Sequence, residues 1–228
     1  MPTAAQDKRR LENEAYLRLP LVRAWLNTVA YAEGTGDNYN MIVGERQGKG
    51  SITDFSRHPG VMRRLNIRGK ATPTSAAGRY QFIGTTYTGM GNATGLTDFS
   101  PHSQDVNAVE ALRQNGALNA LLSGNMRELV ARSGRTWAGI PGELSRKHNQ
   151  PSRSEGDVLA AYGNFMRQAG MPAEQVARFV RPPVGTDPAV NAANLVRTQT
   201  PAPLRTPRTP ASPGNPATLL DYSNSLRD

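Results

Sequence analysis

Glu33 is the residue of this sequence whose position best suits it to acid–base chemistry. In the stretch 21–34, apolar residues at i, i+3, i+4 and i+7 predict a helix with one buried face; they are Val22, Trp25, Leu26 and Val29. The same face reaches Glu33 one turn later, and Gly34 follows where a left-handed C-cap would lie. Burial and the negative end of the helix dipole would both keep this carboxyl protonated near neutral pH, as a general acid in glycosidic bond cleavage must be. Spacing alone nevertheless favours a simpler alternative, an ordinary and partly exposed glutamate at a helix end.

The composition limits the classes of partner and of chemistry. The 228 residues carry a net charge of +9, which favours a polyanionic partner such as nucleic acid, an anionic membrane surface or an acidic cell-wall polymer. Only 6% of the residues are aromatic, which argues against a base-stacking nucleic-acid module. The absence of cysteine excludes thiol nucleophiles, disulfides and cysteine-ligated zinc.

No metal, cofactor or membrane span is expected from the sequence. The three histidines, His58, His102 and His148, lie too far apart for a ligand spacing. Residues 1–20 are rich in charge and lack the apolar core of a signal peptide, and no apolar run approaches the length of a membrane span.

The expected elements divide the chain into three parts. Residues 1–20 are a polar arm, with a helix as one alternative around Leu11, Ala15, Tyr16 and Leu19, and it ends at Pro20. Residues 21–181 form the main domain, and residues 182–228 are a polyproline-prone tail that holds nine of the 17 prolines. Within the domain, two short strands are expected at 40–44 and 51–55, a basic loop at 66–77, and either a third strand or the entry to a helix at 78–83. Glycines at 89–95 favour a surface turn. Helices are expected at 101–115, 117–122, 126–131, 155–169 and 172–180, two of them capped by Ser100 and Ser154.

Several motifs, in a fixed order, resemble the family of the bacteriophage lambda endolysin, small lysozyme-like lytic transglycosylases. They are Ala32–Thr35, Met41–Gly44, Thr53–Pro59, Ala77–Gln81 and Asp98–Asp105, with further matches at Gly116–Leu118 and Trp137–Gly142. The resemblance spans about residues 22–170. It implies an α+β lysozyme-like fold, mainly helical, with a small antiparallel sheet flanking a glycan cleft.

The resemblance also implies a reaction. Glu33 occupies the place of the single catalytic acid, with Ala32 where the family has serine. It would protonate the oxygen that links N-acetylmuramic acid to N-acetylglucosamine. It would then act as the base toward the C6 hydroxyl of the same muramyl residue, giving a 1,6-anhydro product without water or cofactor. In the usual two-carboxylate scheme a second acid attacks the sugar or activates water. Here the C6 hydroxyl of the same sugar would take the place of that water, and its proximity to C1 makes the intramolecular reaction competitive with hydrolysis.

Four further residues are candidates for substrate binding by the same resemblance. Tyr80 and Gln81 are expected in the cleft, and Arg79 belongs to the same motif. The Tyr80 phenol could pack on a sugar face or donate a hydrogen bond to an acetamido group, and the Gln81 amide could bond to sugar polar groups. The alternative, a core tyrosine and a structural glutamine, is less favoured within this motif. Asp54 is either a second carboxylate that stabilises charge on the ring or a turn residue that bonds its own backbone, and the turn is slightly favoured. Trp137 is expected in the core.

Two departures from the family bear on function. The segment 143–150 replaces a Gly-Tyr-Gly-Gln stretch that contributes to the cleft, and neither the arm nor the tail has a counterpart. These appended segments favour a virion-associated enzyme that contacts phage tail proteins through residues 1–20 and 182–228 and acts on peptidoglycan strands during entry. The alternatives are a structural virion protein with little activity, a free cytoplasmic endolysin, and a simple hydrolase that uses Asp54 with Glu33.

Overall fold

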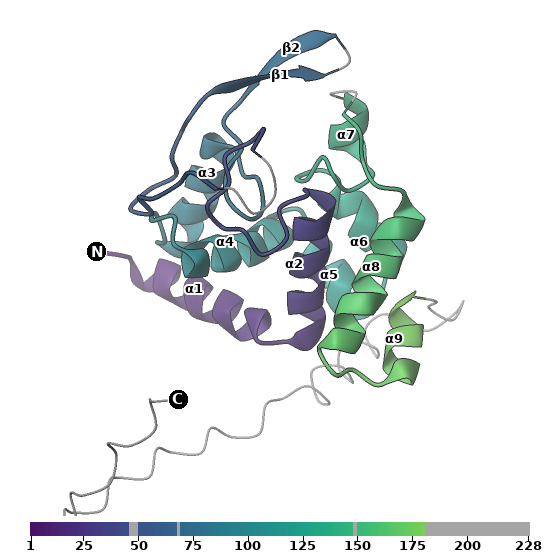
Figure 1. Ribbon diagram of the computed structural model, residues 1–228. Helices are drawn as coiled ribbons and strands as arrows, with labels where there is room; N and C mark the ends of the chain where they lie inside the picture. The colour runs from purple at the N-terminus through teal and green to yellow at the C-terminus, as the bar shows by residue number, and fades with distance from the viewer. Residues whose placement is uncertain (46–49, 68, 148–149, 181–228) are drawn as a thin grey trace, which may run out of the picture.

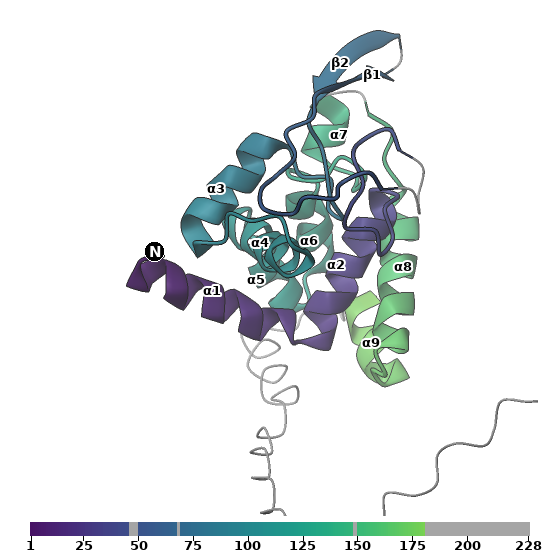
Figure 2. The same cartoon turned by 60° about the vertical axis from the view of Figure 1, so that its left-hand side comes forward.

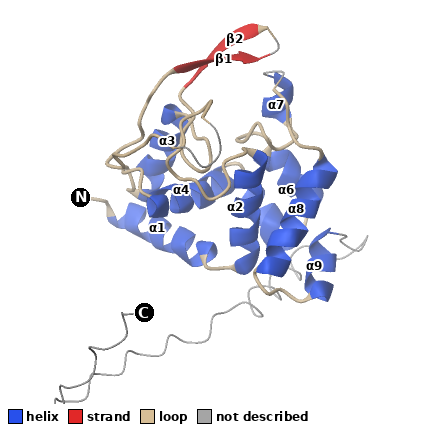
Figure 3. Cartoon of the chain, in the orientation of Figure 1, coloured by secondary structure: helices blue, strands red, loops and turns tan. Residues whose placement is uncertain are grey.

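A computed structural model describes residues 1–45, 50–67, 69–147 and 150–180, and helices dominate these segments (Figure 1). The helices are α1 (Ala4–Leu17), α2 (Pro20–Ala32), α3 (Gly84–Thr94), α4 (Pro101–Gln114), α5 (Ala117–Ser123), α6 (Met126–Ser133), α7 (Glu143–Lys147), α8 (Glu155–Gln168) and α9 (Ala173–Val180). The strands β1 (Arg63–Ile67) and β2 (Lys70–Thr74) pair antiparallel. The predicted α+β class, mainly helical with a small antiparallel sheet, is confirmed (Figure 3).

Helix α2 runs through the middle of the described chain, between α1 and α4 on one side and α8 on the other (Figures 1 and 2). The predicted apolar face is buried: Val22, Trp25, Leu26 and Val29 expose no surface. The Trp25 ring meets Tyr162 of α8 edge-on, 5.3 Å between ring centroids, and its Nε1 donates a 3.2 Å hydrogen bond to Ser133 Oγ. Because each buried side chain of this size contributes about 1.5–3 kcal/mol, α2 and its C-terminal end are firmly placed.

The sheet forms where the sequence pattern indicated a loop. β1 and β2 are a hairpin in which Arg63 pairs with Thr74 and Ile67 with Lys70. Gly69 lies in the turn with a φ of 84°, the left-handed conformation that a two-residue hairpin connection requires. Pro73 and the basic residues of this stretch are typical of a loop, yet proline is compatible with the free edge of a two-stranded ribbon.

The strands expected at 40–44 and 51–55 are not formed by the described residues of these stretches. Ile42 makes only an isolated bridge with Ala77, and the Ile52 N–H donates to Asn40 O at 3.0 Å. Gly44 turns the chain immediately afterwards with a φ of 85°, so the pairing does not extend.

Helix α3 replaces the surface turn expected at 89–95. Tyr87, Met90 and Thr94 are buried along one of its faces, and this burial outweighs the low helix propensity of its glycines. Before it, the Ala77 and Phe82 backbones exchange hydrogen bonds of 3.1 and 3.0 Å, and the chain enters α3 directly. Of the two alternatives for 78–83, the entry to a helix is therefore the one observed.

The N-terminal arm contains a helix, α1, which is the helical alternative for this segment, and it packs on α4. Thr3 caps α1, and the buried Asn13 side chain donates to Glu110 Oε2 of α4 at 2.8 Å. Arg9 lies 3.3 Å from the same buried carboxylate, and Arg113 Nε donates to Asn13 Oδ1 at 3.1 Å. These polar contacts tie α1 to α4 across about a hundred residues of sequence, while the domain boundary at residue 20 stays a prediction.

The C-terminal helices follow the predictions closely. Ser100 Oγ accepts the Ser103 N–H at the start of α4, and Ser154 Oγ accepts the Asp157 N–H at the start of α8, at 3.2 and 3.0 Å. α9 packs on α8 through Val176 and Phe179. The Pro-rich tail at 182–228 lies outside the described residues. None of the helices in the described segments has the length and hydrophobicity to span a membrane.

Candidate active site

Glu33 lies at the C-terminal end of α2, as predicted. Its N–H completes the helix by donating to Val29 O at 2.9 Å, and Gly34 follows with a left-handed φ of 75°. A Cβ at Gly34 would meet no atom within 4 Å, so the backbone angle alone accounts for glycine there. Glu33 as a residue is half-buried at this end of the helix.

The loop after α6 approaches Glu33 through its backbone. Gly139 N–H donates a 2.9 Å hydrogen bond to Glu33 Oε1. A Cβ on Gly139 would lie 2.4 Å from Ala32 O, so only glycine allows the two backbones to come this close. Trp137 anchors the loop: it is 2% exposed and packs against Phe82 with 5.9 Å between ring centroids, as its predicted core position requires.

The environment of Glu33 raises its pKa. Burial disfavours the carboxylate and raises the pKa from 4.5 to about 7, and the hydrogen bond from Gly139, which favours the anion, lowers it by a smaller amount. Of the two effects expected from the sequence, desolvation is the one that accounts for the shift. A group that titrates near neutral pH can give a proton and take one back, because both of its forms are populated.

This shift makes the stability of the fold depend on pH. The pKa of this carboxyl is 4.5 when the chain is unfolded and about 7 when it is folded, so the contribution of Glu33 to stability is greatest below pH 4.5 and is lost as the pH rises through 7. The difference amounts to about 3 kcal/mol. Glu33→Gln cannot ionise, so we expect urea denaturation to find it more stable than wild type at pH 8 by up to this amount and equal to wild type at pH 4. A gain of the same size at both pH values would contradict the raised pKa.

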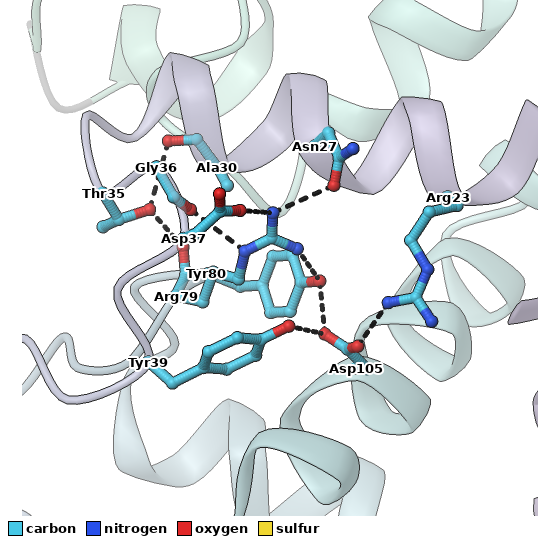
Figure 4. Close-up of polar contacts among 10 residues, drawn as sticks. All are labelled: Arg23, Asn27, Ala30, Thr35, Gly36, Asp37, Tyr39, Arg79, Tyr80 and Asp105. Atoms are coloured by element: carbon cyan, nitrogen blue, oxygen red, sulfur yellow. Dashed lines mark hydrogen bonds and ion pairs between the residues drawn. The ribbon is translucent and has the colours of Figure 1, made fainter. Parts of the chain in front are cut away.

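Arg79 fastens the turn after Glu33 to the loop before α3 (Figure 4). Its guanidinium donates to Gly36 O, Asn27 Oδ1 and Asp37 Oδ1 at 3.0, 2.9 and 2.8 Å. The buried Thr35 hydroxyl donates to the Arg79 carbonyl in return. Arg79 is 3% exposed, so it is committed to these contacts, and the prediction that it binds substrate directly is corrected to a positioning role.

Tyr80 is also buried and belongs to the same network. Its hydroxyl accepts from Arg79 Nη1 at 2.9 Å and donates to Asp105 Oδ1 at 2.6 Å (Figure 4). Tyr39 donates to the same oxygen at 2.9 Å, and Arg23 pairs with Asp105 Oδ2. With 0% of its surface exposed, Tyr80 cannot stack on a sugar, so the expected sugar contact is corrected to support of the loop that carries Gln81.

Gln81 is the residue of the motif that stays open to solvent. It is partly exposed, and its Nε2 donates to Gly78 O at 2.9 Å. Its φ of 47° is the single positive value at a non-glycine position in the part of the chain that the structure describes. Such backbone strain is found where the surroundings enforce it, here in the tight loop closed by Ala77 and Phe82. Sugar binding by Gln81 stays a prediction.

Asp54 forms a turn. Its Oδ1 accepts the Ser56 N–H at 2.8 Å, and this bond lowers the pKa of the exposed carboxyl. Of the two alternatives for this residue, the turn is therefore the one seen, while a contact of Asp54 with substrate stays a prediction.

Comparisons with known proteins agree with this arrangement. The Endolysin family profile matches residues 23–168. The endolysin of Escherichia phage lambda is 34% identical over 128 residues, which cover 53% of this chain and 77% of that protein. The endolysin of Escherichia phage P2 is 34% identical over 133 residues, covering 53% and 79%. The chain belongs to the endolysin family.

A solved structure confirms the fold. Bacteriophage lambda lysozyme complexed with a chitohexasaccharide superposes with a TM-score of 0.55 and 29% identity over 67% of this chain and 95% of that one. A second structure of lysozyme from bacteriophage lambda gives a TM-score of 0.52. The lysozyme-like fold of this endolysin-family chain is thus established. Helices α1 and α9 lie outside the matched residues.

Sequence reasoning missed two residues of the site in this endolysin-family chain. Gly139 was noted as part of a motif, yet its contact with Glu33 spans 106 residues and has no local signal. Asp105 is the last residue of the Asp98–Asp105 motif and lies near the start of α4. Nothing in the motif itself indicates that its carboxylate accepts hydrogen bonds from Tyr39, Tyr80 and Arg23. Because these three partners come from separate parts of the chain, the role of Asp105 can be found only from the packed structure.

Proposed function

We propose that this chain is a peptidoglycan lytic transglycosylase that uses Glu33 as both acid and base. The coarser statement, a phage enzyme that degrades peptidoglycan, follows from membership of the endolysin family. The observation that carries the finer proposal is the Glu33 carboxyl itself, which accepts a hydrogen bond from the Gly139 N–H and has its pKa raised to about 7 by burial.

In the proposed reaction the protonated Glu33 gives its proton to the oxygen between N-acetylmuramic acid and N-acetylglucosamine. The bond from C1 of the muramyl sugar to this oxygen breaks, and the released sugar leaves with a hydroxyl. The Glu33 carboxylate then takes the proton of the C6 hydroxyl on the same muramyl sugar, whose oxygen bonds to C1. The 1,6-anhydro product forms, Glu33 is protonated again, and no water is consumed.

The surrounding carboxylates support a single-acid mechanism. Asp37 pairs with Arg79 at 2.8 Å, and Asp105 accepts from two tyrosines and Arg23. Both carboxylates take part in the network around Arg79. Asp54 accepts a hydrogen bond within its own turn. A two-carboxylate glycosidase needs a second acid placed to attack or to activate water, and each of these three carboxylates already has a partner within the protein.

The test is the chemistry of the products. Purified peptidoglycan is digested with the wild-type chain, and the released fragments are analysed by mass spectrometry. Anhydro-muramyl ends are expected, and reducing ends would instead establish the hydrolase alternative. No release by a folded wild-type chain would favour the structural protein that keeps a lysozyme-like fold.

The setting of the reaction is a separate proposal. Virion association through phage tail proteins is proposed through residues 182–228 and through the exposed face of α1 in residues 1–20, whose other face docks on the chain's own α4. Mass spectrometry of purified virions tests it. Detection of the chain in virions supports the tail-anchored enzyme, whereas detection only in the lysate supports a free endolysin, the description that the phage lambda and P2 relatives carry.

A further inference from the structure

Arg153 lies beside the catalytic acid without belonging to the network around Arg79. Its backbone N–H donates to Gly139 O at 3.0 Å, and the N–H of the same glycine donates to Glu33 Oε1 at 2.9 Å. A single residue, Gly139, therefore links the backbone at 153 to the Glu33 carboxyl.

The side chain of Arg153 is held in place by an aromatic ring. Its guanidinium carbon lies 4.8 Å from the ring centroid of Tyr31, which is two residues before Glu33 on α2. Stacking on an aromatic face leaves the N–H groups at the edge of the guanidinium plane available. Arg153 is exposed, and no carboxylate of the described residues lies within ion-pair distance of it. The result is an exposed cation that an aromatic ring holds in place.

Arg153 does not contribute to the raised pKa of Glu33. The two causes of the raised Glu33 pKa are burial and the Gly139 hydrogen bond, and Arg153 is not among them. Its charge is therefore available to a ligand.

The charge around the site favours an anionic ligand. Residues 143–154, which include α7, hold Arg146, Lys147 and Arg153 against one acidic residue, Glu143, and residues 55–97 are free of Asp and Glu. The second segment includes the exposed Arg63, Arg64 and Lys70 of the hairpin. The hairpin and α7 both lie on the side of the molecule beyond the C-terminal end of α2 (Figures 1 and 2). An anionic polymer would therefore be attracted to the end of α2 that carries Glu33.

We propose that Arg153 binds a carboxylate of the peptide substituent on the muramyl sugar at the cleavage point. The inference rests on the proposed function, because muramyl sugars carry their peptides next to the bond that would be cut. A guanidinium matches a carboxylate with two parallel hydrogen bonds, and stacking on Tyr31 has already restricted the side chain. Arg153 is thus a specificity residue that distinguishes peptide-bearing glycan from bare glycan.

The test measures binding, so that it does not depend on cleavage. In the Glu33→Gln background, fluorescently labelled glycan strands are compared with the same strands stripped of their peptides by an amidase. Adding Arg153→Gln should weaken binding of the peptide-bearing strands about tenfold, the loss expected for a hydrogen-bonded charged group, and leave binding of stripped strands within about twofold. Arg153→Lys should fall between them, because it keeps the charge and loses the paired donors.

The matched control is Arg127→Gln on α6, an exposed arginine whose loss changes the net charge equally. It should alter neither affinity. Equal weakening for both kinds of strand, or no weakening for either, would overturn the proposal.

Two further outcomes separate the sources of the effect. Free stem peptide should displace peptide-bearing strands from the Glu33→Gln chain in which Arg153 is unchanged. This measurement does not depend on the folding of an Arg153 variant. Displacement by polyphosphate at the same concentration of charges would mean a general polyanion surface and would overturn the assignment. If the wild type releases no products while the binding pattern holds, the transglycosylase proposal fails and the assignment of Arg153 stands.

Discussion

Replacing Glu33 by glutamine is expected to lower kcat/KM on peptidoglycan by about 10²- to 10⁴-fold, the range that positioned acid–base groups supply. The loss should lie near the upper end, because the same carboxyl is proposed to give a proton in one step and to take one in the next. The fold should be retained, since the Gln amide oxygen can still accept the N–H of Gly139 that now bonds to Oε1. Steady-state turbidity assays on purified peptidoglycan, with thermal unfolding as the check on folding, make the measurement.

The pH profile adds a second readout for the same variant. Wild-type activity should decline as the pH rises through about 7, where Glu33 loses the proton that it must donate. The residual activity of Glu33→Gln should lack this limb. Glu174→Gln on α9, an exposed glutamate, is the matched control and should behave as wild type. Activity of Glu33→Gln within a few-fold of wild type would mean that another group donates the proton.

Gly139→Ala is expected to lower activity at least about tenfold and to destabilise the fold by about 1–3 kcal/mol, the usual cost of overpacking. The added Cβ would lie 2.4 Å from Ala32 O and 3.0 Å from Glu33 N, both of them backbone atoms that cannot rotate away. The loop must therefore retreat from the end of α2, and the 2.9 Å hydrogen bond to Glu33 is lost. Loss of that bond alone would raise the pKa of Glu33, but the retreat of the loop also lets water reach the carboxyl, which lowers the pKa. Because burial is the larger cause of the raised pKa, the alkaline limb of activity should move to lower pH.

Gly89→Ala is the matched control for this substitution. A Cβ at Gly89 would meet no atom within 4 Å, and the position lies inside α3. Alanine there should leave activity unchanged and stabilise the fold by about 0.5–1 kcal/mol, through its higher helix propensity. Full activity and unchanged thermal stability of Gly139→Ala would show that the loop does not approach α2 as closely as described.

The sequence by itself determined those features whose causes lie within a few residues of one another. Apolar spacing predicts α2 and its buried face, and Gly34 predicts the left-handed end that leaves Glu33 as the last residue of the helix. Serine caps predict the starts of α4 and α8. The ordered motifs predict the family, which the comparisons confirm. Capping hydrogen bonds and helical periodicity involve residues close together in the chain, so they can be predicted from the sequence alone.

Only the tertiary structure decided which motif residues meet the substrate and which support the others. Tyr80 is a supporting residue: its buried hydroxyl is bonded both by its neighbour Arg79 and by Asp105, which lies 25 residues further along the chain. The polar residues of α1 are typical of a solvated arm, and only the tertiary structure places Asn13 in a buried hydrogen bond with Glu110. Gly139 reaches Glu33 because two backbones pack at a distance that no side chain would permit. The free energy of such contacts depends on desolvation and close packing between segments about a hundred residues apart, and no local pattern records which segments will meet.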